Sequence, residues 1–412
     1  MENQILKAEK IIFGGNCISK IEEGINKGKT VLISGALPNE VVEVEFLSST
    51  KDYEIGKVVK ILEKSPHRIE PKCKYFGICG GCNLQFATDE YQVQLRKEIL
   101  FDNLSVIENN NVKLPEIKVI SDNFWSYRNR FQFHNGGLME LKSNKSIKID
   151  KCLVACDEIN TLLSDKEFTN NSCFLNASRY HVFGYNQCLK GAILQEKNTN
   201  RIVGKSKKKV KSGGKRKIYE GTLLNPESFM SIQVLDREIT FDVKGFFQSN
   251  VKMLEKTIEI LKKDFGGENL LDMYAGVGTF STFLLDNFNN SVLVEHNRDA
   301  ISLAEINLQG KKHESYGISG DKWAKEYASK IKTKFDGVVI DPPRSGIEKS
   351  VLDWLCNSNI PSISSLSCDP ITHSRDLKIL VNCGYKIKEI YLLDFYPQTH
   401  HIESLAILEK DL

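Results

Sequence analysis

The chain of 412 residues lacks the features of a membrane or exported protein. No apolar run approaches the roughly 20 residues that a helix needs to cross a bilayer. The first residues, MENQILKAEKIIFGGNC, contain no apolar stretch typical of a secretory signal. Neither sign of charge is in large excess, because the formal net charge is only +3. We therefore expect a globular protein that stays in the cytoplasm and is not basic overall.

Two nucleotide-binding signatures are incomplete. The stretch ENLLDMYAGVGTFS reads as a strand, a glycine-rich turn and a helix, and Gly276 and Gly278 would let a ligand approach the backbone closely. A dinucleotide-binding fingerprint needs a third glycine at position 281, where Ser281 stands. The lysine of a phosphate-binding loop is also missing. These absences disfavour NAD as the ligand.

Acidic residues stand at the ends of two further strands of the predicted sheet. Glu295 ends SVLVE, about twenty residues after the glycine turn, where an acid hydrogen-bonds the ribose of a bound nucleotide. Asp341 follows the strand FDGVVI and begins DPPRSG. An adenosine ligand without pyrophosphate fits this pattern, and acids would favour the cationic sulfonium of S-adenosylmethionine.

The length of the chain and the changes of residue pattern along it predict three domains. Residues 1–65 read as short strands punctuated by Pro, Gly and Asn, which is typical of a small β-barrel. Residues 66–235 are irregular and hold a cysteine cluster. In residues 236–412 short apolar strands alternate with helical stretches, which predicts an α/β fold with a doubly wound parallel sheet.

Eleven cysteines in a protein expected in the cytoplasm indicate metal or catalytic roles rather than a disulfide framework. The stretch CKYFGICGGC brings Cys73, Cys79 and Cys82 close together around a Gly-Gly pair. A fourth ligand is available at Cys152 or Cys156. Zinc held by four sulfurs and an iron–sulfur cluster both fit this spacing.

Two further stretches allow two interpretations each. The run 201–217, RIVGKSKKKVKSGGKRK, has nine Lys or Arg and no acid, so it is either a solvated loop or a contact for nucleic-acid phosphates. The stretch WSYRNRFQFH interleaves aromatic residues with Arg128 and Arg130. Its aromatic side chains either stack on RNA bases or pack in an ordinary core.

Several segments match one family in order: CKYFGICGGCNLQ, FFQSN, DMYAGVGTF, DPPR, and LSCDP followed by DFYPQTHHIES. Over almost its whole length the sequence resembles the RNA uracil-C5 methyltransferases, and most closely their iron–sulfur-containing ribosomal RNA branch. The resemblance implies a Rossmann-like class I methyltransferase domain preceded by a TRAM-like barrel and a central iron–sulfur and RNA-binding domain. It also implies a structural 4Fe-4S cluster on Cys73, Cys79, Cys82 and Cys152, with Cys152 preferred over Cys156.

The resemblance also implies the chemistry. Cys368, in LSCDP, would add to C6 of uracil as the nucleophile, and Glu403, in HHIES, would remove the C5 proton. The target base would have to be unpaired or flipped out. The neighbouring His400 and His401 would line the site or face solvent rather than bind metal.

Cofactor contacts follow from the same resemblance. They are assigned to Gln248, Tyr274, Glu295 and Asp341, together with the glycines of the turn, and Asp321 would meet the adenine amine. The sequence departs from the family at Ala275, where Cys is frequent, and at Thr279, where some members have Asn. The basic run 201–217 is longer and richer in lysine than in the family.

The expected function is S-adenosylmethionine-dependent formation of 5-methyluridine in 23S ribosomal RNA by a monomer. The same chemistry on transfer RNA is one alternative. Methylation of an exocyclic amine is a second, and it needs no thiol. A silent RNA-binding module is a third, which the presence of Cys368, Glu403 and the glycine turn disfavours.

Overall fold

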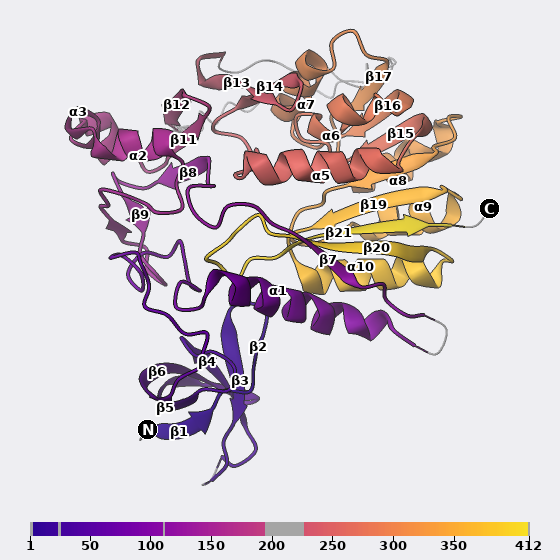
Figure 1. The fold of residues 1–412 in the computed structure, drawn as a ribbon. Coiled ribbons are helices and arrows are strands. Elements are labelled where there is room, and N and C mark those ends of the chain that lie inside the picture. The colour runs from indigo at the N-terminus through magenta and orange to yellow at the C-terminus, as the bar shows by residue number, and fades with distance from the viewer. Residues whose placement is uncertain (1–2, 24–25, 110–111, 194–225, 411–412) are drawn as a thin grey trace, which may run out of the picture.

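The computed structural model describes residues 3–23, 26–109, 112–193 and 226–410, so the basic run 201–217 lies outside the described residues. In Figure 1 a small curled sheet lies at one end of the molecule, a large sheet with its helices at the other, and an irregular region beside both. No helix among the described residues is long and apolar enough to span a membrane.

The N-terminal strands form one curled six-stranded sheet in the order β1-β5-β6-β4-β3-β2. Alternate residues, such as Val31 and Ile33 or Val42 and Val44, are buried inside it, as expected for strands with one face on a core. This half-barrel confirms the predicted strands. Its strands are β1 (Gln4–Lys7), β2 (Lys10–Ile11), β3 (Asn16–Lys20), β4 (Thr30–Ser34), β5 (Val41–Ser49) and β6 (Tyr53–Glu63).

The irregular region has its own small core, in which Phe131, Phe133, Phe174 and Val182 pack together. Its three-stranded sheet has the order β12-β11-β8. Its elements are β8 (Arg130–Phe133), β9 (Leu138–Met139), β10 (Ser146–Ile147), α2 (Asp157–Ser164), α3 (Lys166–Thr169), α4 (Ser172–Leu175), β11 (Tyr180–Tyr185) and β12 (Cys188–Ile193).

The large sheet has eight strands in the order β17-β16-β15-β18-β19-β21-β20-β7. The predicted strands are confirmed, but the expectation of an all-parallel sheet is wrong, because β21 runs antiparallel to both its neighbours. The strands are β7 (Ile117–Ile120), β15 (Gly267–Met273), β16 (Phe288–Val294), β17 (His313–Tyr316), β18 (Gly337–Ile340), β19 (Ser362–Ser367), β20 (Lys386–Leu393) and β21 (Glu403–Glu409).

Helices cover both faces of the large sheet, because alternate strand residues point to opposite sides. Leu270, Leu293 and Val339 pack with α5, α6 and α7. Leu271, Val292 and Val338 pack with α8, α9 and α10. These helices are α5 (Val251–Lys263), α6 (Thr279–Leu284), α7 (Arg298–Asn307), α8 (Gly320–Glu326), α9 (Lys349–Asn357) and α10 (Pro370–Asn382). Three short 3-10 turns are η1 (Ser105–Ile107), η2 (Pro226–Ser228) and η3 (Ala328–Lys330).

The predicted domain limits and the observed packing differ in two places. The edge strand β7 of the large sheet comes from the segment 66–235. The hairpin of β13 (Phe229–Val234) and β14 (Arg237–Asp242) straddles residue 235. A strand too short to be stable alone gains its hydrogen bonds by joining the edge of a larger sheet. The local sequence pattern does not reveal which sheet it joins.

One disulfide, between Cys356 and Cys383, joins α9 to the residue after α10, with 5.3 Å between the Cα atoms. The sequence indicated metal or catalytic roles for the cysteines and did not single out this pair. The two thiols are 27 positions apart in the chain. They meet because the C-terminal ends of two neighbouring helices lie side by side on one face of the sheet.

Helix α1 (Asp89–Leu104) connects the half-barrel to the large sheet. Figure 1 shows it between the indigo barrel and the yellow C-terminal strands, and one continuous apolar core runs from the barrel past Leu95 and Ile99 to Leu392. Arg96 is fully buried there and donates to Asp394 at 3.0 Å and to the Thr399 carbonyl at 3.0 Å. Burial raises the pKa of Asp394 in spite of Arg96.

We expect Arg96→Leu to lower the free energy of unfolding by about 3–5 kcal/mol, because it leaves the Asp394 carboxylate buried without its partner. Denaturant titration measures this loss. Lys97→Ala is the matched control, since its ion pair with Glu116 lies at the surface and should contribute about 0–1 kcal/mol. If both variants lost the same free energy of unfolding, the Arg96–Asp394 pair would not have the expected role in stability.

Candidate active site

A cavity of about 1760 Å³ opens at the carboxyl ends of the parallel strands. This is the edge of an open α/β sheet where ligands bind. The cavity collects most of the side chains that the sequence singled out. Those lining it are Gln248, Tyr274, Gly276, Glu295, Asp341, Cys368, His401 and Glu403.

The glycine turn after β15 forms one wall of the cavity. Gly276 has a φ of 55°, and a Cβ placed on it would meet no atom within 4 Å, so the backbone there faces open space. Its amide donates to the Glu295 carboxylate at 3.1 Å. Glu295 stands directly after β16, as predicted, and its other oxygen accepts from the Asn297 amide at 2.6 Å.

Ser281, which stands in place of the third glycine, supports a buried acid below the turn. Its hydroxyl and amide donate to Asp272 at 2.7 and 3.1 Å. Burial raises the pKa of Asp272 to about 6. The serine therefore fixes the start of α6 to the strand β15.

Two predicted cofactor residues lie elsewhere. Gly278 is the N-cap of α6 and does not line the cavity; a Cβ there would lie 3.0 Å from that of Ala304, so this glycine lets α6 pack closely on α7. Asp321 lies in the first turn of α8, where it pairs with Lys325 at 2.7 Å and accepts from the Ser350 hydroxyl at 2.8 Å. Both residues therefore make contacts between helices, α6 with α7 and α8 with α9, which the sequence pattern did not indicate.

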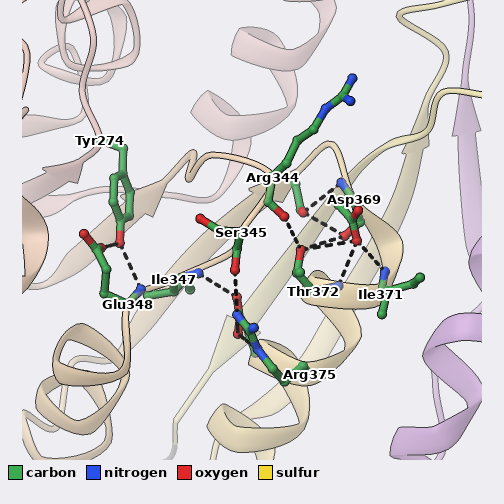
Figure 2. Close-up of polar contacts among 11 residues, drawn as sticks. Tyr274, Arg344, Ser345, Ile347, Glu348, Asp369, Ile371, Thr372 and Arg375 are labelled. Carbon is green, nitrogen blue, oxygen red and sulfur yellow. Dashed lines mark hydrogen bonds and ion pairs between the residues drawn. The ribbon is translucent and has the colours of Figure 1, made fainter.

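The loop after β18, which begins at Asp341, is held from below by α10, as Figure 2 shows. Asp376 accepts from the Ile347 amide at 2.8 Å, and Arg375 donates to the Ser345 carbonyl at 3.0 Å. Tyr274, whose φ is positive at 64°, contacts the carboxylate of Glu348 through its hydroxyl. Tyr274 and Asp341 follow the paired strand ends Met273 and Ile340, so these contacts hold them at neighbouring places in the cavity wall.

Cys368 and Glu403 are brought together by strand pairing. Ser367, the last residue of β19, pairs with Ser404 of β21. Because the two strands are antiparallel, the next position on β19 and the preceding position on β21 come together, and these are Cys368 and Glu403. Asp369 then caps α10 by accepting from the Ile371 and Thr372 amides at 3.0 and 2.9 Å.

A buried serine and histidine hold this pairing. The Ser404 hydroxyl lies 2.7 Å from His373 Nδ1 and donates to the Ser367 carbonyl at 3.3 Å. It therefore links α10, β19 and β21 one residue away from both Cys368 and Glu403. Burial lowers the pKa of His373 to about 4, so the imidazole is neutral at pH 7.

Burial and mutual repulsion keep the acids of the cavity wall protonated to unusually high pH. Burial and then the charge of Asp272 raise the pKa of Asp341 to about 7. Burial and then Asp341 raise the pKa of Glu403 well above its ordinary value. Burial, Glu403 and Asp341 raise the pKa of Cys368 to about 11. Groups with such shifted pKa values are typical of catalytic sites.

Sequence reasoning missed two exposed side chains of the cavity. Phe246 is 71% exposed and lies two residues before Gln248, in the segment FFQSN. Arg344 ends the segment DPPR, and its guanidinium points away from the contacts that hold the loop (Figure 2). Its charge lowers the pKa of both Cys368 and Glu403 against the larger effect of burial. Phe246 and Arg344 could have been found from the sequence, because both lie inside segments that match the family, FFQSN and DPPR.

The aromatic and basic stretch divides between core and cavity. Tyr127, Phe131 and Phe133 are buried, which favours the core-packing interpretation for these three. Arg128 and Arg130 line the cavity. Arg130 is held by the Gly245 carbonyl at 2.8 Å.

The thiols of the cysteine cluster are neighbours in space. Burial, with smaller contributions from the charges of Cys152 and Cys79, raises the pKa of Cys82 to about 12. Burial also raises the pKa of Cys79, with a contribution from Cys73. The positive charge of Arg128 works against these effects and lowers the pKa of Cys79, Cys82 and Cys152.

These thiols do not form a site for a single metal ion. Within the part of the chain that the structure describes, no three His, Cys, Asp or Glu side chains converge closely enough to hold one. The iron–sulfur cluster is therefore not confirmed. Cys156 is turned away from the cluster, since its thiol donates to the Gly184 carbonyl at 3.2 Å.

Fold and cavity together define a class. A sheet in this strand order, with a glycine turn after its first central strand and an acid after the next, is the class I fold of S-adenosylmethionine-dependent methyltransferases. Residues 252–354 match the family model described as Methyltransferase small domain, and residues 324–411 match that of tRNA (Uracil-5-)-methyltransferase.

Similar proteins agree with this class. A Treponema denticola protein named as an uncharacterized RNA methyltransferase is 38% identical, and the alignment covers 100% of both chains. A 23S rRNA (uracil-C5)-methyltransferase of Haemophilus parainfluenzae is 26% identical over 98% of this chain and 96% of its own. The solved Pyrococcus abyssi tRNA (uracil-54, C5)-methyltransferase, in complex with S-adenosyl-L-homocysteine, has a TM-score of 0.68 at 21% identity and covers 98% of this chain and 100% of its own.

The chain belongs to the RNA uracil-5-methyltransferase family.

We expect Asp341→Asn to raise the melting temperature by several degrees at pH 8 and to lose this advantage towards pH 4. The folded pKa of about 7 exceeds the ordinary 3.8, so between these values the folded state binds more protons than the unfolded state. The carboxyl group therefore destabilises the fold as pH rises through this window. Melting curves at several pH values measure the effect, with the exposed Asp353→Asn as control. A difference that does not vary with pH would contradict it.

Proposed function

We propose that the protein methylates C5 of a uridine in 23S ribosomal RNA with S-adenosylmethionine as methyl donor. The observation that carries the proposal is the adjacency of Cys368 and Glu403 on paired strands, at the wall of the cavity that also contains the Gly276 turn. Methylation of an amine needs no thiol, whereas methylation of a pyrimidine carbon needs a nucleophile and a base on one side of the ring.

The residues around the glycine turn fit an adenosine ligand. The space over Gly276 admits a group against the backbone, and Glu295 lies where a ribose hydroxyl would be bound. Asp341, Tyr274 and Gln248 line the same cavity. Bound S-adenosylmethionine supplies the methyl group and a positive charge, which the carboxyl groups of Glu295 and Asp341 favour.

The thiol and carboxyl groups then perform the chemistry on the uracil. Cys368 gives up its proton to solvent and its sulfur bonds to C6, so that the electron pair of the C5–C6 double bond moves towards C5. C5 then takes the methyl group from the sulfonium, whose C–S bond breaks to leave S-adenosylhomocysteine. Glu403 takes the C5 proton, the C5–H electron pair restores the C5–C6 double bond, and the sulfur leaves C6. A carboxyl group with a pKa well above its ordinary value is a stronger base than an exposed one.

The choice of ribosomal RNA rests on the relatives. Proteins of Haemophilus parainfluenzae and Legionella pneumophila named as 23S rRNA uracil-C5-methyltransferases are 26% and 27% identical to this chain. The archaeal protein of similar fold is named for transfer RNA, which is the second candidate. Monomeric state and location in the cytoplasm stay predictions.

We also propose a 4Fe-4S cluster held by Cys73, Cys79, Cys82 and Cys152. The mutual charge effects of these thiols and their proximity to Arg128 support it. A cluster is larger than one ion, so its ligands stand farther apart than those of a mononuclear site. When bound, it would cross-link the 73–82 loop to the segment before α2.

Glu403→Gln should slow formation of 5-methyluridine by roughly 10²–10⁴-fold and accumulate a covalent protein–RNA adduct, while Cys368→Ala should give neither product nor adduct. Denaturing gels and nucleoside mass spectrometry, on both 23S rRNA and tRNA transcripts, measure this. Cys188→Ala, an exposed thiol on β12, is the control and should behave as wild type. Activity retained in Cys368→Ala would favour the amine methyltransferase instead.

Protein purified without oxygen should be brown and contain iron and sulfide. Cys152→Ser should lose the iron, whereas Cys156→Ser should keep it, because the Cys156 thiol bonds Gly184. Metal analysis and absorbance spectra distinguish the two variants. Colourless protein that contains zinc would contradict the cluster.

A further inference from the structure

A second cavity, of about 630 Å³, lies on the irregular region away from the cofactor turn. Lys72, the segment before β8, residues 150–153 and helix α2 surround it. Its lining includes Lys72, Trp125, Lys151, Leu153, Asp157 and Asn160. None of these residues lines the larger cavity.

Trp125 differs from the other aromatic residues of its stretch. Tyr127, Phe131 and Phe133 are buried in the core, whereas Trp125 is only partly buried and lines the second cavity. Its indole nitrogen donates to Asp89 at 3.4 Å, which orients the ring. The ammonium of Lys72 lies 5.1 Å from the ring centroid, so a positive charge already stands over the ring.

We propose that this second cavity binds one unpaired nucleotide of the substrate RNA, with its base stacked on Trp125 and its phosphate bound by Lys72 and Lys151. Nucleobases stack on aromatic rings without regard to sequence, and lysines bind phosphates as point charges. The inference rests on the proposed function and names where the strand next to the target uridine is held.

The chain itself connects the two cavities. The amides of Ser126 and Arg128 donate to the carbonyls of Leu153 and Val154 at 3.0 and 2.8 Å, so this segment is paired with the one before α2, with a bend at Ser126, whose φ is 54°. Even a fully extended chain spans no more than roughly 10 Å from Trp125 to Arg128. Arg128 lines the larger cavity. A strand whose target base enters that cavity therefore reaches Trp125 within a few nucleotides.

Two lysines, Lys72 and Lys151, and two acids, Asp150 and Asp157, line the second cavity. Together with Lys74, which binds Asp150, they leave a local balance of one positive charge. Asp150, also in the lining, is bound by Lys74 and by the Tyr75 hydroxyl, both at 2.8 Å, which offsets its charge. The Asn160 side chain is fixed by the Cys152 amide and carbonyl at 2.8 and 3.0 Å and so forms a rigid polar wall. Lys72 and Lys151 stand on the rim, both exposed.

Tryptophan fluorescence tests the inference directly, because the chain has only three tryptophans. Trp323 is fully buried and packs against Trp354 at 5.0 Å, on helices of the large sheet. Titration of wild type with unmodified single-stranded rRNA fragments should therefore quench the emission of Trp125. Trp354→Phe should retain this quenching, and Trp125→Phe should lose it.

Affinity gives the second readout. Trp125→Leu should weaken RNA binding on the order of tenfold, and Trp125→Phe should restore most of it, because phenylalanine still stacks. The affinity for S-adenosylmethionine should not change in either variant. The inference would be overturned if Trp125→Leu bound RNA as tightly as wild type, or if RNA bound wild type without quenching the emission of Trp125.

A pair of charge variants keeps the test valid if Trp125→Leu fails to fold. Lys72→Ala with Lys151→Ala should flatten the slope of log affinity against log salt by about 1.4, as expected for two lost phosphate contacts on a single strand. An unchanged slope would overturn the inference. Failure of wild type to form 5-methyluridine would instead contradict the proposed function, so the two failures are distinguishable.

Discussion

The antiparallel insertion of β21 between β19 and β20 is the constraint on which the site depends. It places Ser404 opposite Ser367 and so brings Glu403 to Cys368 across the two strands. A slip of one residue would turn every side chain of β21 to the opposite face. Leu405, Ala406 and Leu408 are fully buried, and the Ser404 hydroxyl forms a hydrogen bond with His373. Both the apolar packing and this hydrogen bond specify the register.

The same pairing forces acidic groups together in a poorly hydrated wall. Asp272, Asp341 and Glu403 all have raised pKa values, and burial is the first cause for each. Such a wall opposes folding at neutral pH, and the apolar packing on both faces of the sheet has to offset it. A carboxyl group held close to neutral is, in turn, suited to moving a proton. Stability is thereby reduced at the place where reactivity is needed.

The three regions of the molecule converge beside this wall. The backbone amide of His400, the residue before the cavity-lining His401, donates to the side-chain oxygen of Asn83, which follows the 73–82 loop, at 2.9 Å. The ring centroid of His400 lies 6.3 Å from that of Phe13 in the half-barrel. Arg128 lines the cavity, and its positive charge also lowers the pKa of the Cys82 thiol. The half-barrel and the residue that follows the 73–82 loop therefore contact the segment that leads to the cavity-lining His401.

The sequence by itself determined the local features: the strands of the half-barrel and of the large sheet, the Gly276 turn, and the acids at two strand ends. These depend on neighbours in the chain, on periodic burial and on glycine's freedom at positive φ. The order of the matched segments also predicted the family. Only the tertiary structure decided that β21 is antiparallel and that β7 joins the large sheet. It also decided that Asp321 contacts Lys325 of α8 and Ser350 of α9, and that Trp125, alone among the aromatic residues of its stretch, lines a cavity. Each of these depends on contacts between residues far apart in the chain, whose register and packing no local pattern encodes.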